Sequence, residues 1–153
     1  MKRKGTRGWL CVAGLLLMSG SALGHHSDAG RYEETLTTVK GAVVQVQLIN
    51  PHSMLILEVK DENGKPVLWR GELGSPAQLK QLGWVSGAIK VGDTVTMRGR
   101  RLKSGAPYMT LSECARVIDA NGKELFRGNN PGRPATEAGT APANGDPCAG
   151  PIK

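Results

Sequence analysis

Aromatic side chains are scarce in this chain of 153 residues, which has one phenylalanine, two tyrosines and three tryptophans. Two of the tryptophans, Trp69 and Trp84, are expected to lie in the core of the folded domain. Proteins that bind single-stranded nucleic acid need exposed aromatic rings on which bases stack, in addition to positive charge. The low aromatic content therefore argues against nucleic acid as a partner.

Cysteine and histidine are also rare, with three residues of each. Cys11 lies close to the amino terminus, and the other two cysteines, Cys114 and Cys148, are far apart in the sequence. No two cysteines have the close spacing of a zinc site. Cys114 and Cys148 can form one disulfide bond, and spacing alone does not decide whether they do.

The apolar run from Trp9 to Met18 is too short to cross a bilayer comfortably. It follows a basic start and precedes several small residues, which is the pattern of a secretory signal. We therefore expect residues 1–24 to be a signal peptide that is removed. The mature protein would then be soluble, in the periplasm or outside the cell, with no stable membrane anchor.

Two cleavage positions fit the small residues at the end of this signal. A cut after Gly24 releases a chain that starts at His25, and we favour this position. A cut after Ala22 releases a chain that starts at Leu23, so that His25 becomes its third residue. The identity of the first residue decides which chemical groups are available at the amino terminus.

The excess of positive charge belongs largely to the signal. The chain has 20 Lys and Arg against 13 Asp and Glu, and four of the basic residues lie in residues 1–24. Subtraction leaves 16 against 13, a net charge of +3, which does not argue for a polyanion partner. The one basic run of the domain, from Arg98 to Lys103, is interpreted as a solvated edge strand, with an anionic envelope polymer as the alternative.

Residues 129–153 are rich in Pro, Gly, Ala and Asn and have almost no large apolar side chain. Such a segment cannot bury enough surface to offset the entropy of ordering it, so we expect a disordered tail. Between the signal and the tail, residues 25–128 have the size of one small domain.

This domain is expected to consist mainly of β-strands. From Val44 to Leu48, apolar and polar residues alternate as they do in a half-buried strand, and Gly41 allows a long strand to bend. Further strands are expected over residues 54–60, 67–73, 91–102 and 108–118, with a last hairpin turn at Asn121-Gly122.

A short helix is expected between the third and fourth strands. Ser75 is a suitable N-cap, Pro76 suits the first helical position, Gln78 completes a capping box and Gly83 ends the helix. Five strands with one helix after the third, and a long bent first strand, have the order of an OB-fold. The predicted fold class is therefore mainly β, a small OB-fold-like five-stranded barrel.

Several short motifs together resemble a family of small exported bacterial proteins, the domain of unknown function 6152 family. The motifs are His25-His26-Ser27, Gly41-Ala42-Val43, Asn50-Pro51-His52-Ser53, Trp69, Glu72, Gly74-Ser75-Pro76, Leu79, Gly83-Trp84 and Val91-Gly92-Asp93-Thr94-Val95. The resemblance implies export and a small β-barrel. It implies no activity, because none is established for the family.

The chain departs from the family pattern in two places. An aromatic residue commonly follows the His-Ser element in the family, whereas here Asp28-Ala29-Gly30 intervenes before Tyr32. An aromatic residue such as tryptophan usually follows Asn-Pro-His, and this chain has Met54 there. Because of the first departure, we expect the amino-terminal segment to dock differently from that of other family members. Because of the second, the thioether of Met54 takes the place of an aromatic ring.

His25 and His26 are the main candidates for a metal site. In a chain that starts at His25, the free amine and the imidazole of that residue together chelate one transition metal ion. His52 would supply a third nitrogen from the turn between the first two strands. This nitrogen-rich set suits tetragonal copper(II) better than zinc, and Met54 would offer a soft ligand to copper(I).

The other cleavage position leads to a different metal site. A free amine with histidine at the third position binds copper(II) or nickel(II) through the amine, two deprotonated amides and the ring. Simpler roles compete with both sites: a frayed polar terminus for His25 and His26, a strand end for His52, and packing for Met54.

The sequence thus predicts an exported, non-enzymatic protein that binds copper for storage, delivery or buffering. The alternative is an envelope module that binds a protein or an anionic polymer on the barrel face, without a metal. Nothing in the residue pattern indicates a substrate cleft, and Ser75 is explained by helix capping rather than by catalysis.

Overall fold

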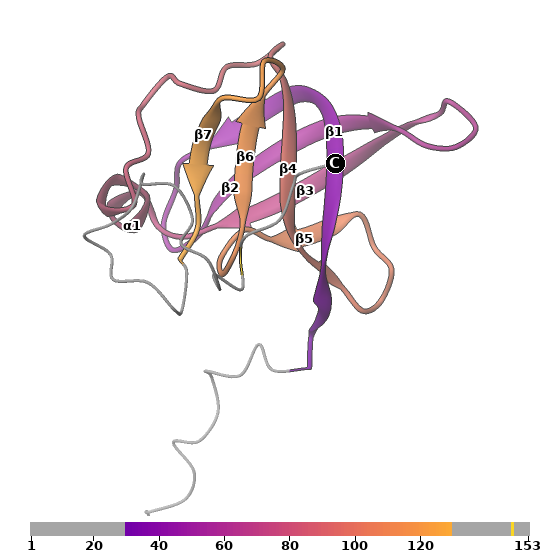
Figure 1. Cartoon of the computed structure of the whole chain (residues 1–153), viewed down its shortest axis with the longest axis horizontal. Helices are drawn as coiled ribbons and strands as arrows, with labels where there is room; N and C mark the ends of the chain where they lie inside the picture. The colour runs from indigo at the N-terminus through magenta and orange to yellow at the C-terminus, as the bar shows by residue number, and fades with distance from the viewer. Residues whose placement is uncertain (1–29, 130–147, 149–153) are drawn as a thin grey trace, which may run out of the picture.

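The computed structural model describes residues 30–129 and Cys148 (Figure 1). Within these residues the strands are β1 (Tyr32–Gln47), β2 (Ser53–Lys60), β3 (Pro66–Leu73), β4 (Thr94–Leu102), β5 (Tyr108–Thr110), β6 (Arg116–Asp119) and β7 (Glu124–Arg127). One helix, α1 (Pro76–Gln81), lies between β3 and β4. It is too short to span a membrane, and the described residues contain no helix that could.

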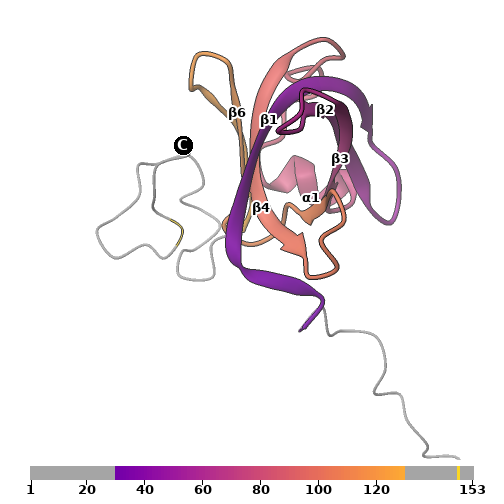
Figure 2. The same cartoon turned by 90° about the vertical axis from the view of Figure 1, so that its right-hand side faces the viewer.

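The first five strands close into a barrel. β1 pairs antiparallel with both β2 and β4, β3 pairs with β2 and, in parallel, with β5, and β5 pairs with β4. Figure 2 shows β1 to β4 curling around a common axis, with α1 close to the barrel. The expected mainly β fold, a five-stranded barrel with one short helix between β3 and β4, is confirmed.

β1 closes the barrel because it changes partner along its length. Its first part pairs with β4 and its last part with β2, and Ala42 lies opposite both Glu58 and Thr94. A Cβ atom on Gly41 would overlap the backbone of Glu58. Glycine at this position therefore lets the two backbones approach where β1 passes from one partner to the other.

A β-bulge in β1 changes which of its residues face the core. The register of β1 against β2 shifts between Val43 and Gln45. Val43 is buried, whereas Val44 is 37% exposed and Leu48 is 41% exposed. The alternation of residues 44–48 therefore indicated a strand correctly, and Val46 packs against the core, but Val44 is exposed at the bulge and Leu48 lies beyond the end of β1.

The helix forms as its sequence predicts. Ser75 is the N-cap, its side chain accepts a hydrogen bond from the backbone N–H of Gln78, and the reciprocal bond of the capping box is present. Leu79 is 1% exposed and belongs to the core, and Gly83 has a φ of +84° just after the helix. The capping box and the glycine thus define both ends of α1.

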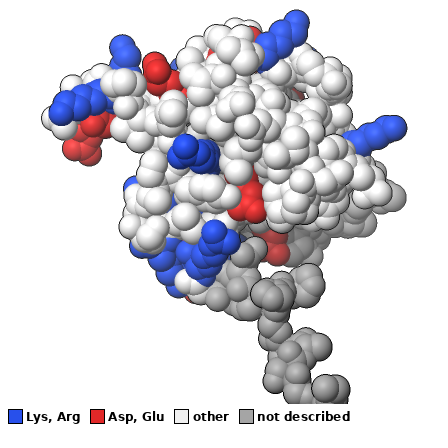
Figure 3. Space-filling model, turned by 180° about the vertical axis from the view of Figure 1, so that it is seen from behind, with Lys and Arg blue, Asp and Glu red and all other residues white. Residues whose placement is uncertain are grey.

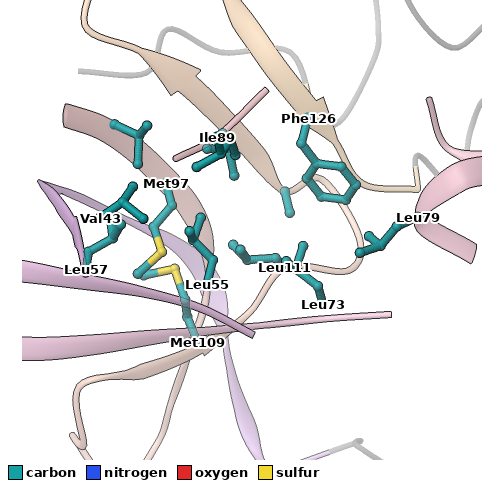
Figure 4. Packing of buried hydrophobic residues seen from close by; sticks show 13 residues of the cluster. Val43, Leu55, Leu57, Leu73, Leu79, Ile89, Met97, Met109, Leu111 and Phe126 are labelled. Carbon is teal, nitrogen blue, oxygen red and sulfur yellow. The ribbon is translucent and has the colours of Figure 1, made fainter. Parts of the chain in front are cut away.

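Aliphatic side chains and two methionines, rather than aromatic rings, fill the barrel. Met97 of β4 and Met109 of β5 are fully buried, and their sulfur atoms lie next to each other (Figure 4). Phe126 of β7 covers one side of this core and meets the ring of Trp84 edge-on at 5.6 Å. Trp84 and Trp69 are only partly buried, so they border the core instead of filling it.

The strand expected over residues 108–118 is interrupted. β5 and β6 pair with the same edge of β4. Thr110 and Arg116 are six positions apart, but their partners on β4 are two positions apart. The additional residues leave the sheet at a turn in which Cys114 has a φ of 57°. The apolar pattern did not reveal this excursion, because Leu111 and Ala115 are buried on either side of it.

The interpretation of Arg98 to Lys103 as a solvated edge strand is wrong. These residues lie in and just after β4, which pairs with β1 along one edge and with β5 and β6 along the other. Arg98 is only 5% exposed, and its guanidinium donates a hydrogen bond to the backbone carbonyl of Cys148 at 2.8 Å. Barrel closure makes β4 a central strand, which the sequence pattern alone did not show.

A disulfide bond joins Cys114 to Cys148, with the two Cα atoms 4.8 Å apart. Both cysteines are buried. Most of the expected tail lies outside the described residues, as does the expected signal. Cys148 itself is held against the barrel by the disulfide and by Arg98.

We expect Cys148→Ser to lower the free energy of unfolding by about 3 to 4 kcal/mol, because the bridge closes a loop of 34 positions. Urea denaturation of the oxidised protein and of the variant measures this difference. The double variant Cys114→Ser/Cys148→Ser should be no less stable than the single one, because both lose the same bridge. Equal stability of wild type and variant would contradict a stabilising bridge.

Candidate functional site

The carboxylate of Glu72 is the centre of a group of polar side chains on the outer surface of the barrel. Its Oε1 atom lies 2.9 Å from Nδ1 of His52. Its Oε2 atom accepts a hydrogen bond from the hydroxyl of Tyr32 at 3.2 Å and another from the hydroxyl of Tyr108. One carboxylate thus holds three side chains that are far apart in the sequence.

The barrel strands bring these four residues together. Tyr32 begins β1, Tyr108 begins β5, Glu72 lies near the end of β3, and His52 immediately precedes β2. Tyr32 is buried at 7% exposure, and the Glu72 side chain is 19% exposed. The site is therefore built from strand ends on a rigid barrel, with its carboxylate largely shielded from water.

The ring of His52 contacts Glu72 on one side and is exposed to solvent on the other. Nδ1 of His52 lies 2.9 Å from Oε1 of Glu72, so this ring nitrogen faces the carboxylate and Nε2, on the opposite side of the ring, points away from it. The side chain of His52 is 58% exposed. It follows Pro51, and the Asn50-Pro51 peptide bond is cis. The arrangement presents an oriented nitrogen ligand at the surface.

Tyr108 is held in its neutral form. Burial raises the pKa of its hydroxyl well above the usual 10, and the hydrogen bond to Glu72 raises it further. A hydroxyl that donates to a carboxylate loses this bond on ionisation and then faces a like charge. Tyr108 is therefore a proton donor to Glu72 throughout the physiological pH range.

Met54 shares the outer face of the barrel with this group. It lies opposite Glu72 in the register of β2 and β3, and opposite Gln47 in the register of β1 and β2. Its neighbours Ser53 and Leu55 are buried, so the alternation of the strand turns Met54 outward. Met54 and His52, two positions apart, are thus placed beside the same carboxylate.

His25 and His26 lie outside the described residues, so the structure does not position them. Within residues 30–129 and at Cys148, no group of three or more His, Cys, Asp and Glu side chains is arranged to hold a metal ion. Of the predicted ligands, the structure brings together His52 and Met54. A metal site at this surface would need ligands from beyond the described residues.

Sequence reasoning did not assign roles to Tyr32, Glu72 and Tyr108. A signal for Glu72 was present, because the hairpin expected from residues 54–60 and 67–73 places residue 72 opposite Met54. The two tyrosines could not be found in this way. They reach Glu72 only when β1 closes the barrel and β5 adds to β3.

The surface around the barrel is largely uncharged on the face shown in Figure 3, and Lys and Arg side chains gather toward one side of it. Some of the basic residues are engaged within the fold. The Arg101 guanidinium lies 5.0 Å from the ring centre of Trp69 and donates hydrogen bonds to the carbonyls of Gly105 and Ala106. Arg101 therefore stabilises the turn between β4 and β5.

Comparison with known proteins gives one match. A family model described as a family of unknown function (DUF6152) matches residues 13–110, which is more than half of the chain. No curated protein and no solved structure matches significantly. The resemblance inferred from the sequence motifs is thereby confirmed.

We expect Glu72→Gln to lower the pKa of Tyr108, because the variant removes a negative charge beside the hydroxyl while burial remains. Spectrophotometric titration near 295 nm in a Tyr32→Phe background follows Tyr108 alone, since the chain has two tyrosines. The exposed carboxylate of Glu58 provides the control variant Glu58→Gln, which should leave the titration unchanged. An identical titration curve for Glu72→Gln would show that burial alone raises the pKa.

Proposed function

The chain belongs to the DUF6152 family, whose function is unknown, and we propose from its own site that it is an exported, non-enzymatic copper-binding protein. It begins at His25 after removal of residues 1–24. Copper is bound by the amine and ring of His25, with His52 as a further nitrogen ligand. His26 stands beside this site as an additional imidazole.

The observation that carries this proposal is the contact of 2.9 Å between Nδ1 of His52 and Glu72. Histidines that bind metals almost always donate their second ring N–H to a carboxylate, a carbonyl or water, which fixes the tautomer and makes the other nitrogen a better ligand. In His52 the Nδ1 atom lies against a carboxylate, as this arrangement requires, and the side chain is exposed. Tyr32 and Tyr108 in turn orient the carboxylate.

The amino terminus is within reach of His52. Tyr32 binds the same carboxylate as His52, so β1 starts at the site itself. Six positions separate His26 from Tyr32, and six residues extend at most about 20 Å. The segment before Tyr32 is therefore long enough to bring both terminal histidines back to His52.

The donor types favour copper. An amine and imidazoles suit tetragonal copper(II), and the thioether of Met54 beside Glu72 would suit copper(I). The exposure of His52 favours exchange of the ion with a partner, which is the property that a storage or delivery protein needs.

The test is a copper(II) titration of protein whose intact mass shows that it begins at His25. We expect His52→Ala to weaken copper binding at least tenfold. Glu72→Gln should weaken it about tenfold, because it loosens the orientation of His52. Electron paramagnetic resonance should show nitrogen hyperfine lines that change in His52→Ala.

Two controls separate the proposed site from incidental binding. Glu58→Gln changes an exposed carboxylate on the same strand as Met54 and should not alter copper affinity. A chain with an extra amino-terminal methionine lacks the chelating amine of His25 and should bind copper more weakly. Unchanged affinity in both His25→Ala and His52→Ala would refute the proposal.

A further inference from the structure

A cleft opens beside the Glu72 group, between α1 and the ends of β3, β5 and β7. Its volume is about 340 Å³, within the range of small-ligand sites. The buried side chains of Leu73, Leu111 and Phe126 form its apolar lining. The cleft and its lining do not depend on a metal ion.

The polar rim of the cleft consists of uncharged groups. Gln78, Gln81 and Asn129 contribute amides, and Thr110 and Ser112 contribute hydroxyls. The hydroxyl of Thr110 donates to that of Ser112 at 3.1 Å. No hydrogen bond within the described residues occupies the side-chain amides of Gln81 and Asn129, so both are available to a ligand.

The charge in the cleft favours an uncharged ligand. The described residues that line it include neither lysine nor arginine, so it offers no strong site for an anion. Its one carboxylate, Glu72, already contacts His52 and accepts hydrogen bonds from Tyr32 and Tyr108. A cation would have to compete with these donors.

A second cleft, of about 410 Å³, continues along the same surface. It shares Thr110 and Ser112 with the first cleft and extends from them past Tyr32. Unlike the first cleft it is lined by charged side chains of both signs, namely Arg100, Lys103, Glu33, Glu34 and Glu113. Because Thr110 and Ser112 line both clefts, one ligand of several monomer units could lie across the two. OB-folds commonly bind such oligomers on the barrel surface.

An extended peptide does not fit this surface well. Peptides that add a strand to a sheet need a free strand edge. β3 and β5, which line the cleft, are each paired on both sides, and β7, which has only β6 as a partner among the described strands, contributes a single buried ring, Phe126, to the lining. Recognition must therefore come from side chains, and amides and hydroxyls above an apolar floor match hydroxyl and acetamido groups.

We propose that the two clefts bind an oligosaccharide with acetamido groups, such as a chain of N-acetylhexosamine units. The acetamido methyl group and the C–H face of a sugar lie against the partly buried Leu82 and over the edges of Leu111 and Phe126, which are themselves at most 4% exposed. The amides of Gln81 and Asn129 bond to the hydroxyl and acetamido oxygens, and the chain continues over Thr110 and Ser112. This site shares His52 and Glu72 with the proposed copper site, but it does not rest on copper binding.

The test uses the metal-free, disulfide-bonded protein and isothermal titration with N-acetylglucosamine tetramer and glucose tetramer. We expect the acetamido tetramer to bind at least tenfold more tightly than the glucose tetramer and more tightly than N-acetylglucosamine itself. Gln81→Ala and Asn129→Ala should each weaken binding about three- to tenfold, the effect of one net hydrogen bond. Gln45→Ala, an exposed amide on β1 away from the cleft, is the matched control.

Three results would overturn this inference. Equal affinity for the two tetramers would exclude recognition of the acetamido group. Unchanged affinity in both Gln81→Ala and Asn129→Ala would place binding elsewhere, and absence of binding at millimolar sugar would exclude the ligand class. Because no copper is present, each of these results leaves the copper titration unaffected, and failure of the copper titration leaves this test unaffected.

Discussion

The antiparallel pairing of β1 with β4 is the interaction on which the rest of the structure depends. Without it, β1 would be the edge of an open sheet, and its amino-terminal half would have no partner. With it, the five strands form a barrel around a core that contains few aromatic rings. Gly41 makes the pairing compatible with the approach of β2, because a side chain there would collide with Glu58.

Closure of the barrel also creates the polar site. Tyr32 stands at the start of β1 and would not meet β3 in an open sheet, but in the barrel its hydroxyl reaches Glu72. Tyr108, which follows Glu72 in the sequence whereas Tyr32 precedes it, is brought to the same carboxylate by β5. Glu72 on β3 therefore gathers side chains from three other segments, and the only described histidine is oriented as a result. The start of β1 lies at this site because of the same pairing.

Local signals in the sequence were reliable where a few neighbouring residues decide the structure. The capping box of Ser75 and Gln78, the hairpin between β2 and β3, and the final hairpin formed as expected. These local signals failed where contacts between residues far apart in the sequence decide the structure. The bulge between Val43 and Gln45 leaves Val44 exposed, and the excursion before β6 interrupts the fifth strand, each to fit partners far away in the chain.

The basic residues of β4 show the same limit. A run of arginines next to a turn has the composition of an exposed edge, and only the pairing of β4 on both sides shows that Arg98 is buried against Cys148. The role of each arginine in β4 depends on which backbone carbonyls and strands lie next to it in the folded protein. These neighbours are set by barrel closure and not by composition.

The sequence by itself determined most of the secondary structure, the family, the order of the helix and the first four strands, and the residue types available for a metal site, because these depend on local patterns and on side-chain chemistry. The tertiary structure alone decided that Nδ1 of His52 lies against Glu72, that two tyrosines hold this carboxylate, and that a cleft with uncharged polar groups lies beside it. These features join segments that are 20 to 40 positions apart or more. Only the closed barrel, in which each strand has a partner on both sides, brings such segments within hydrogen-bonding distance.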